Sequence, residues 1–288
     1  MRVTRLSGID LNRFTFDMDV TWNAFFTDAD LNVYSRYGGR DGGEPDERMS
    51  VSSLLRTMDE VLAEHQRPSG RKRFQPRQPG RQTPRDIPLL KANHRGCVRC
   101  HIAREYQLLQ SFHDKTFSRR ELFRFPLPET LGVTIRTEHG HQVERVEPKS
   151  AAATAGVKPG DVITSVGDVP VHSDYDIRFG LDRSAEPALA GRPIAWTLRR
   201  LYDDGEIRTL KVSLRPARGW WAYDIGWKIS LRSAPFRTGM RGYSLAPSQR
   251  KDLGISVKTL GVKISSIYSD GFGRSIGLKK RDVVVGIP

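Results

Sequence analysis

Two cysteines and a histidine lie close together in the stretch GCVRCH, at Cys97, Cys100 and His101. The chain has 288 residues and only these 2 cysteines. Their spacing fits four kinds of site. These are covalent haem c with the histidine on iron, a redox-active dithiol, part of a zinc site, and a pair of ordinary structural cysteines.

The residues around the motif favour haem c among these sites. Both thiols that would add to the porphyrin and the imidazole that would bind iron are present in Cys97, Cys100 and His101. A zinc site needs four ligands, and only His94 and His113 are available nearby, without a second Cys-x-x-Cys. A redox dithiol usually follows a buried strand at a helix start, whereas PLLKANHRG is a poor buried strand.

The second axial ligand of such an iron is not marked by any motif. An open position would favour binding of a gas or peroxide, and a filled one would favour electron transfer. The residues with suitable chemistry are His65, His94, His113, Met58 and Met240.

The charge of the chain is strongly positive, with 47 Lys and Arg against 33 Asp and Glu. The densest basic run, residues 67–85, is rich in proline and is typical of a solvated linker. No zinc finger or aromatic-basic sheet motif accompanies it, so nucleic acid is an unlikely partner. No run of about 20 apolar residues is present, so no transmembrane segment is expected.

The first 66 residues predict two strands and a helix. Phe14–Phe26 alternates like a half-buried strand, and Val33–Gly39 reads as the second strand of a hairpin. Residues 49–64 have helical periodicity. This order resembles the second half of a thioredoxin-like fold. The helix would bury an apolar face of Val51, Leu54, Leu55, Met58, Val61 and Leu62.

Residues 87–112 are expected to be mostly helical around the cysteines, and the pattern changes from Leu131 onward. Strand signals at LGVTI and HQVERVEP precede a small-residue helix, the turn GVKPGDV, a helix over 174–183 and a hairpin at Asp204-Gly205. This order resembles the PDZ domains of bacterial periplasmic proteases. The resemblance implies a partly open β-barrel with two helices.

A PDZ domain implies binding of a carboxy-terminal or extended peptide of a partner protein by strand addition. The resemblance assigns the carboxylate to the backbone N–H groups of Leu131, Gly132 and Val133. Ile177 and Leu181, on the 174–183 helix, fit the peptide groove and the core equally well.

A second, shorter copy of the PDZ pattern follows. Gly156–Val162 and Gly277–Val283 share the same internal spacing, and LGISV at 253–257 echoes LGVTI. The sequence stops at Pro288, before the helix and last hairpin that a PDZ domain requires. We therefore expect this chain to be a fragment of a longer protein. The aromatic stretch GWWAYDIGWKIS at 219–230 predicts a strand packed on a core rather than a membrane anchor.

Taken together, these motifs resemble a bacterial, planctomycete-type family that joins a thioredoxin-like segment, a Cys-x-x-Cys-His motif and PDZ modules. The expected fold class is α+β with several domains. They are a partial thioredoxin-like segment at 1–66, a basic linker at 67–86, a helical Cys-x-x-Cys-His segment at 87–128, a PDZ domain at 129–217, and an aromatic connector with a truncated second PDZ-like segment at 218–288.

The predicted function is extracytoplasmic redox or electron transfer, with haem c and a redox partner, beside PDZ-mediated peptide binding. The alternative is a non-catalytic PDZ interaction module whose cysteines are structural, zinc-binding or redox-active. The start of the chain lacks a signal peptide, so the periplasmic location predicts an export signal upstream of Met1. No Gly-x-Ser-Gly-like loop or triad order suggests a protease.

Overall fold

The computed structural model describes residues 3, 5–67, 80–189, 191–231, 240–256, 259–268 and 272–286. The chain divides into two compact units, Met1–Ser230 and Leu231–Pro288. Among the described residues, no helix combines the length and the apolar character needed to cross a bilayer. Most of the basic run predicted as a linker lies outside the described residues.

The amino-terminal hairpin is confirmed and is shorter than predicted. β1 (Asn23–Thr27) pairs with β2 (Val33–Gly38) in an antiparallel two-stranded sheet. Residues 14–22 form bends, a short turn and irregular backbone instead of the expected strand, although Phe16 and Met18 are still buried. Since no other described strand joins this sheet, the thioredoxin-like assignment remains a prediction.

Helix α1 (Val51–Gln66) is confirmed, but of the six apolar residues predicted to be buried only Val61 is buried. Ser50 caps the helix by accepting a hydrogen bond from the Ser53 N–H at 3.0 Å. The buried residues are Ser53, Thr57 and Val61, which anchor the helix largely through hydrogen bonds. The apolar residues left exposed on the other side are Val51, Leu55, Met58 and Leu62.

The cysteine-bearing segment contains two helices, α2 (Pro88–Asn93) and α3 (Cys100–His113), separated by an irregular stretch. Three 3₁₀ turns flank them, at Pro84–Asp86, Arg119–Phe123 and Pro128–Leu131. Their apolar side chains share one core with the amino-terminal segment and with α5 (Asp174–Leu189). Leu6, Leu11, Leu90, Ala103 and Phe179 belong to this core.

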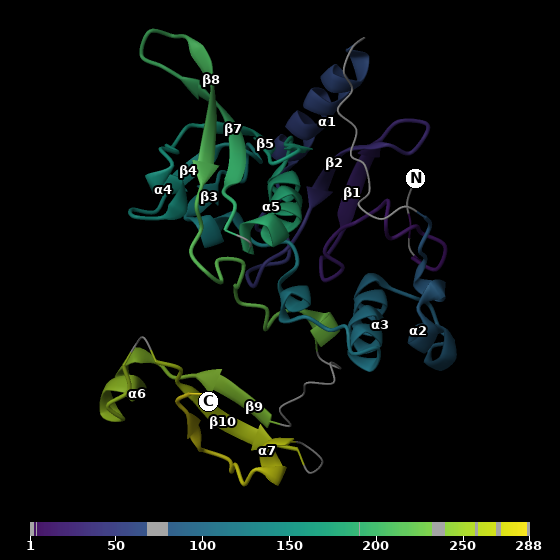
Figure 1. Cartoon of the computed structure of the whole chain (residues 1–288), viewed down its shortest axis with the longest axis vertical. Helices are drawn as coiled ribbons and strands as arrows, with labels where there is room; N and C mark the ends of the chain where they lie inside the picture. The colour runs from purple at the N-terminus through teal and green to yellow at the C-terminus, as the bar shows by residue number, and fades with distance from the viewer. Residues whose placement is uncertain are drawn as a thin grey trace. The chain divides into compact units, whose positions relative to one another are not determined.

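The region from Val133 to Leu214 forms two small sheets around α5 (Figure 1). One sheet pairs β3 (Val133–Ile135) with β4 (Val143–Val146), and the other has the order β6-β5-β7-β8. The two sheets and α5 share one hydrophobic core, which includes Val133, Ile163, Trp196 and Leu198. The remaining elements are α4 (Ala151–Thr154), β5 (Val162–Val166), β6 (Val169–Pro170), β7 (Ile194–Leu201) and β8 (Ile207–Leu214).

The aromatic stretch at 219–230 contains no strand, contrary to the sequence prediction. It forms turns and enters a short 3₁₀ helix, Ile229–Leu231, and Trp220 packs against the PDZ-like core. Its end is fixed by two buried contacts. Lys228 Nζ lies 2.8 Å from Asp17 Oδ2, and the Ser230 N–H donates to Asp19 Oδ1 at 2.8 Å.

The second unit contains a three-stranded sheet of order β11-β10-β9. The strand before β10 is β9, not the predicted stretch at 253–257. Residues 253–254 form a turn after α6, and residues 255–256 have no regular structure. The elements are β9 (Met240–Ser244), α6 (Pro247–Asp252), β10 (Val262–Ile267), α7 (Phe272–Ser275) and β11 (Val283–Val284).

The internal repeat seen in the sequence extends to the backbone hydrogen bonds. The Gly160 N–H donates to the Val143 carbonyl at 2.8 Å, and the Arg281 N–H donates to the Ile264 carbonyl at 2.8 Å. Gly160 has φ +90° and Arg281 has φ +81°, so both positions adopt the left-handed conformation. The second copy therefore tolerates a side chain where glycine is the favourable residue.

Candidate functional site

The loop before β3 packs against helix α5, and the peptide groove expected of a PDZ domain lies between β3 and this helix. Gly132 has φ +86°, and a Cβ atom there would lie 2.2 Å from the Ser150 Cβ, so both conformation and space require glycine. β3 pairs only with β4 among the described strands, so its second edge carries no strand partner. A free edge is what a peptide needs to bind by strand addition.

The predicted peptide-binding residues come together here, but their side chains point into the core. Leu131 is 1% exposed, and Val133, Ile177 and Leu181 are 0% exposed. All four belong to one hydrophobic cluster. Any peptide contact from Leu131 to Val133 would therefore come from their backbone, and the roles predicted for Ile177 and Leu181 in contacting peptide side chains remain untested.

A different pair of α5 residues faces the groove, and sequence reasoning missed it. Asp174 and Arg178 stand four residues apart, with Arg178 Nε 2.9 Å from Asp174 Oδ2, and both are buried. A small pocket at the groove is lined by Asp174 together with Ile135, Thr137 and Arg48. The four-residue spacing of Asp174 and Arg178 on the predicted 174–183 helix was the sequence signal that could have indicated this ion pair.

The segment 39–50, which we call the strap, runs over this groove. The Arg48 guanidinium contacts both walls, at 2.9 Å from Glu129 Oε1 and 3.9 Å from Asp174 Oδ1. Arg178 Nη1 donates to the Arg40 carbonyl at 2.9 Å. The Ser50 hydroxyl donates to the carbonyl of Thr137, just beyond β3, at 3.2 Å. The strap thus bridges the loop, the strand end and the helix.

The charge of Arg48 fits this bridging position. Burial disfavours its charged form, but Asp174, Glu129 and Asp41 outweigh burial and raise the pKa of Arg48 above its usual value. Arg48 Nε lies 2.5 Å from Asp41 Oδ2, so an ion pair within the strap also fixes the position of the Arg48 side chain. Removing the guanidinium would leave two partly buried carboxylates, on Glu129 and Asp174, without this counter-charge.

A polar cluster joins α1 to the segments just before β4 and just before α5. Glu60 lies between two histidines, with Oε1 3.0 Å from His141 Nε2 and Oε2 3.2 Å from His172 Nδ1. His141 Nδ1 is 2.9 Å from the Ile163 carbonyl. Both ring nitrogens of His141 therefore contact oxygen atoms, one of the Glu60 carboxylate and one of the Ile163 carbonyl.

These contacts change the pKa values of the cluster. Burial would raise the pKa of Glu60, but hydrogen bonds from His141 and His172 outweigh it and lower the value to about 2. Burial would lower the pKa of His172, but the hydrogen bond to Glu60 and the charge of Asp176 raise it. For His139, burial and the nearby His141 lower the pKa to about 4.

The cysteine motif lies at the start of α3. Cys97 is exposed, Cys100 is half-buried at the first helical residue, and neither forms a disulfide. Burial raises the pKa of the Cys100 thiol, which makes it a weaker nucleophile at neutral pH. Among the described residues, no group of three or more His, Cys, Asp or Glu side chains could hold a metal ion.

A cavity of about 820 Å³ lies beside α3, but Cys97, Cys100 and His101 do not line it. A covalent porphyrin would therefore lie outside that cavity, and haem c remains a prediction from the motif.

The predicted axial ligands are dispersed. His94 Nε2 is 3.3 Å from the Cys97 carbonyl, so His94 is beside the motif. His65 contacts Tyr34, His113 contacts Asp114, and Met58 is exposed on α1. Met240 belongs to the second unit.

Comparisons with known proteins identify the groove-bearing region. A family model described as a PDZ domain matches residues 142–187, from the start of β4 into α5. The periplasmic pH-dependent serine endoprotease DegQ of Escherichia coli K12 is 29% identical over 150 residues, which are 52% of this chain and 28% of that protein. The periplasmic serine endoprotease DegP of Salmonella typhimurium is 27% identical over 152 residues, 53% of this chain and 27% of that protein.

A probable periplasmic serine protease of Haemophilus influenzae, described as do/HhoA-like, is 29% identical over 153 residues, 53% of this chain and 28% of that protein. The chain thus spans less than a third of the length of these three relatives. The match to the family model and the arrangement of β3 to β8 around α5 agree. The chain contains a PDZ domain, and PDZ domains bind proteins or peptides.

Proposed function

We propose that this protein works outside the cytoplasm as a PDZ interaction module that captures peptide segments of a partner protein. The observation that carries this proposal is the PDZ match over residues 142–187, next to a β3 edge that pairs with no other described strand. The peptide would add to β3, and its carboxylate would bind at the Leu131–Val133 loop. The extracytoplasmic location is supported by relatives named as periplasmic.

The charges along the groove predict which peptides bind. Because α5 carries the charged pair Asp174 and Arg178, we expect polar or charged peptide residues opposite this part of the helix. The strap must leave the groove before the peptide enters, since Arg48 contacts both walls. Peptide binding therefore competes with the contacts of Arg48.

Fluorescence anisotropy with a library of labelled carboxy-terminal peptides tests the proposal. We expect saturable binding by a subset of peptides, and loss of most affinity when the same peptides carry an amidated carboxyl end. Binding that ignores both the peptide sequence and its free carboxylate would refute capture at the Leu131–Val133 loop.

A substitution in the strap tests whether the groove is the binding site. Arg48→Ala removes the contacts to Glu129 and Asp174, so the strap should leave more easily and peptide affinity should rise by roughly tenfold. Arg56→Ala, an exposed arginine on α1, is the matched control and should leave affinity unchanged. Equal affinity in wild type and Arg48→Ala would place binding elsewhere.

A further inference from the structure

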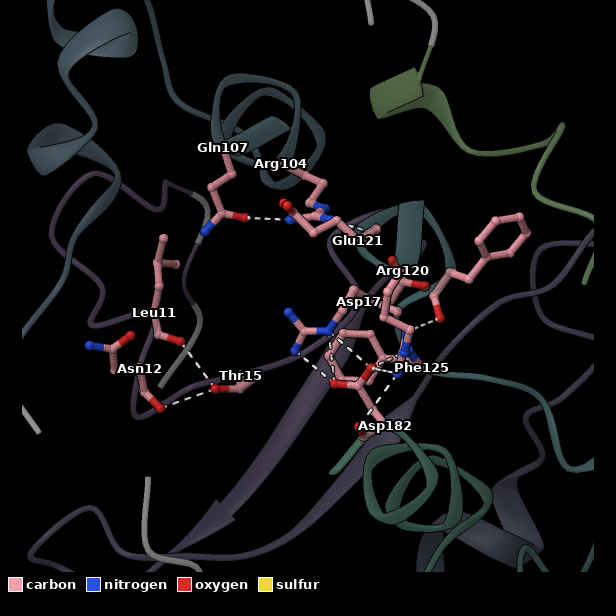
Figure 2. A network of polar contacts seen from close by, with 12 residues as sticks. Leu11, Asn12, Thr15, Asp17, Arg104, Gln107, Arg120, Glu121, Phe125 and Asp182 are labelled. Atoms are coloured by element: carbon pink, nitrogen blue, oxygen red, sulfur yellow. Dashed lines mark hydrogen bonds and ion pairs between the residues drawn. The ribbon is translucent and has the colours of Figure 1, made fainter. Parts of the chain in front are cut away.

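A large cavity lies apart from the peptide groove, within the first unit. It has a volume of about 820 Å³ and is enclosed by the amino-terminal segment, α3, the 3₁₀ turn at Arg119–Phe123 and α5. Figure 2 shows Arg104 and Gln107 extending from α3 on one side, Asp182 of α5 on the opposite side, and Leu11 to Thr15 at the flank. The volume is large enough for a small organic molecule.

The lining has two chemical parts. Buried apolar side chains form one part, and they include Leu11, Phe16, Met18 and Phe125. Polar and charged side chains of α3 and the adjoining turn form the other part. A cavity with an apolar surface and a few converging polar groups is typical of a ligand site.

Arg104 is the unusual member of the polar part. Its Nη1 donates to the Gln107 side-chain oxygen at 3.2 Å and its Nη2 donates to the Glu121 carbonyl, so both partners are neutral oxygens. No carboxylate of the described residues forms an ion pair with Arg104, and its Nε has no acceptor among them. Burial and the nearby charge of Arg124 lower the pKa of Arg104, and the charges of Glu121, Asp17 and Asp19 offset this only in part.

A second donor lies on the same wall. Arg120 precedes the residue whose carbonyl accepts from Arg104, and its buried Nε has no hydrogen-bond partner. Its Nη2 pairs with Asp182 at 2.8 Å, so only the Nε remains available. A buried donor without an acceptor costs free energy unless a bound group or water supplies one.

Six carboxylates line the cavity, those of Asp17, Asp86, Asp114, Glu121, Asp182 and Glu186. Among them, Asp17 and Asp182 have cationic partners. Asp182 accepts from Arg120, Arg124 and the Phe125 N–H, and Asp17 pairs with Lys228. Burial would raise the pKa of Asp182, but Arg124 and Arg120 outweigh it and lower the pKa well below its usual range. These acids are therefore not available to Arg104, and an added anion would be.

We propose that this cavity binds a small amphiphilic anion, whose charged head group pairs with Arg104 and the Nε of Arg120 and whose apolar body packs on Phe16 and Phe125. The shared chemistry is one acidic group on an alkyl or aromatic body. This site shares no residue with the peptide groove, so either function can hold without the other.

The fluorescent anion 8-anilinonaphthalene-1-sulfonate is a suitable probe, because it has an acidic group on an aromatic body. With the full chain we expect saturable, one-to-one fluorescence enhancement. Decanoate and 1-naphthoate then compete as alkyl and aromatic acids, while 1-decanol serves as the uncharged control. Displacement of the probe by either acid and not by 1-decanol supports the site. The acid that competes more strongly shows whether the site prefers an alkyl or an aromatic ligand. Displacement by 1-decanol as efficiently as by decanoate overturns it.

Two variants locate the binding. Arg104→Gln should weaken the probe by about tenfold or more, since a charge-assisted hydrogen bond is lost. Arg119→Gln, an exposed arginine of the neighbouring turn, is the matched control and should bind like wild type. Equal binding by Arg104→Gln and Arg119→Gln overturns the proposal.

A third variant covers the case in which Arg104→Gln unfolds. Ser111→Phe leaves Arg104 in place and fills the cavity from the half-buried Ser111 on α3. Circular dichroism and thermal unfolding establish which variants are folded. Folded Ser111→Phe should lose saturable binding, and retained binding in that variant would overturn the cavity as the site.

Discussion

Glu60 links α1 to His141 and His172 through one carboxylate, so its protonation affects how firmly α1 is held. The pKa of Glu60 is lowered to about 2 from 4.5, so the stability it contributes is present above about pH 4.5 and is lost as the pH falls toward 2. The pKa of His172 is raised, so its contribution is present below about pH 6.5 and is lost as the pH rises through its folded value.

His139 acts in the opposite direction to His172. Its pKa is lowered to about 4 from 6.5, so its contribution is present above pH 6.5 and is lost as the pH falls through 4. The His172 contribution changes only above about pH 6.5, whereas the His139 contribution changes between pH 6.5 and 4, so the two act in separate pH ranges.

Glu60→Gln should lower the free energy of unfolding by about 1–3 kcal/mol at pH 5.5, because two histidines lose a charged acceptor. The difference from wild type should shrink as the pH falls toward 2, where Glu60 itself becomes protonated. Urea unfolding at both pH values measures this. Asp59→Asn, at an exposed position on the same helix, is the control, and an equal loss in both variants would contradict the role of the cluster.

The two cysteines differ in their surroundings, and their alkylation should differ too. Iodoacetamide should modify the exposed Cys97 faster than Cys100, whose thiol is half-buried and has a raised pKa. Mass spectrometry of protein made without haem maturation measures the two rates. Protein made with that machinery should carry the haem mass and resist alkylation at both positions, and unmodified, alkylatable thiols there would rule out haem c.

At the scale of elements, the hairpin, α1 and the order of the PDZ elements are predictable because local patterns determine them. The buried face of α1 is not, since helical periodicity places the apolar residues on one side without saying which side meets the protein. Here Tyr37 and the His172 carbonyl select the polar side through Ser53 and Thr57. The strap was missed because its contacts join residues more than 80 positions apart.

This assignment of the α1 faces predicts opposite effects of two substitutions. Leu55→Gln alters an exposed side chain and should change the free energy of unfolding by less than about 0.5 kcal/mol. Thr57→Val keeps the shape but removes the hydroxyl that donates to the His172 carbonyl at 2.8 Å, and should cost about 1–2 kcal/mol. Chemical denaturation compares them, and a larger cost for Leu55→Gln would restore the face expected from periodicity.

At the scale of the whole molecule, the first unit is closed by contacts between distant parts of the chain. The sequence placed the end of the PDZ domain at 217, where the last hairpin finishes. In the structure, Lys228 and Ser230 return to Asp17 and Asp19 near the amino end, and all four side chains are buried. Oppositely charged residues more than 200 positions apart leave no local pattern in the sequence. The contact between Lys228 and Asp17 could therefore not be predicted from the sequence.

A protein truncated after Ala217 should therefore be less stable than one truncated after Ser230. The shorter protein leaves Asp17 and Asp19 buried without Lys228 and Ser230, and losing one partner of a buried pair typically costs about 3–5 kcal/mol. Thermal and urea unfolding of the two proteins compare them. In the longer protein, Lys228→Met should reproduce much of the loss, whereas Lys211→Met, on β8, should not. Equal stability of the two truncated proteins would show that the PDZ fold is complete without residues 218–230.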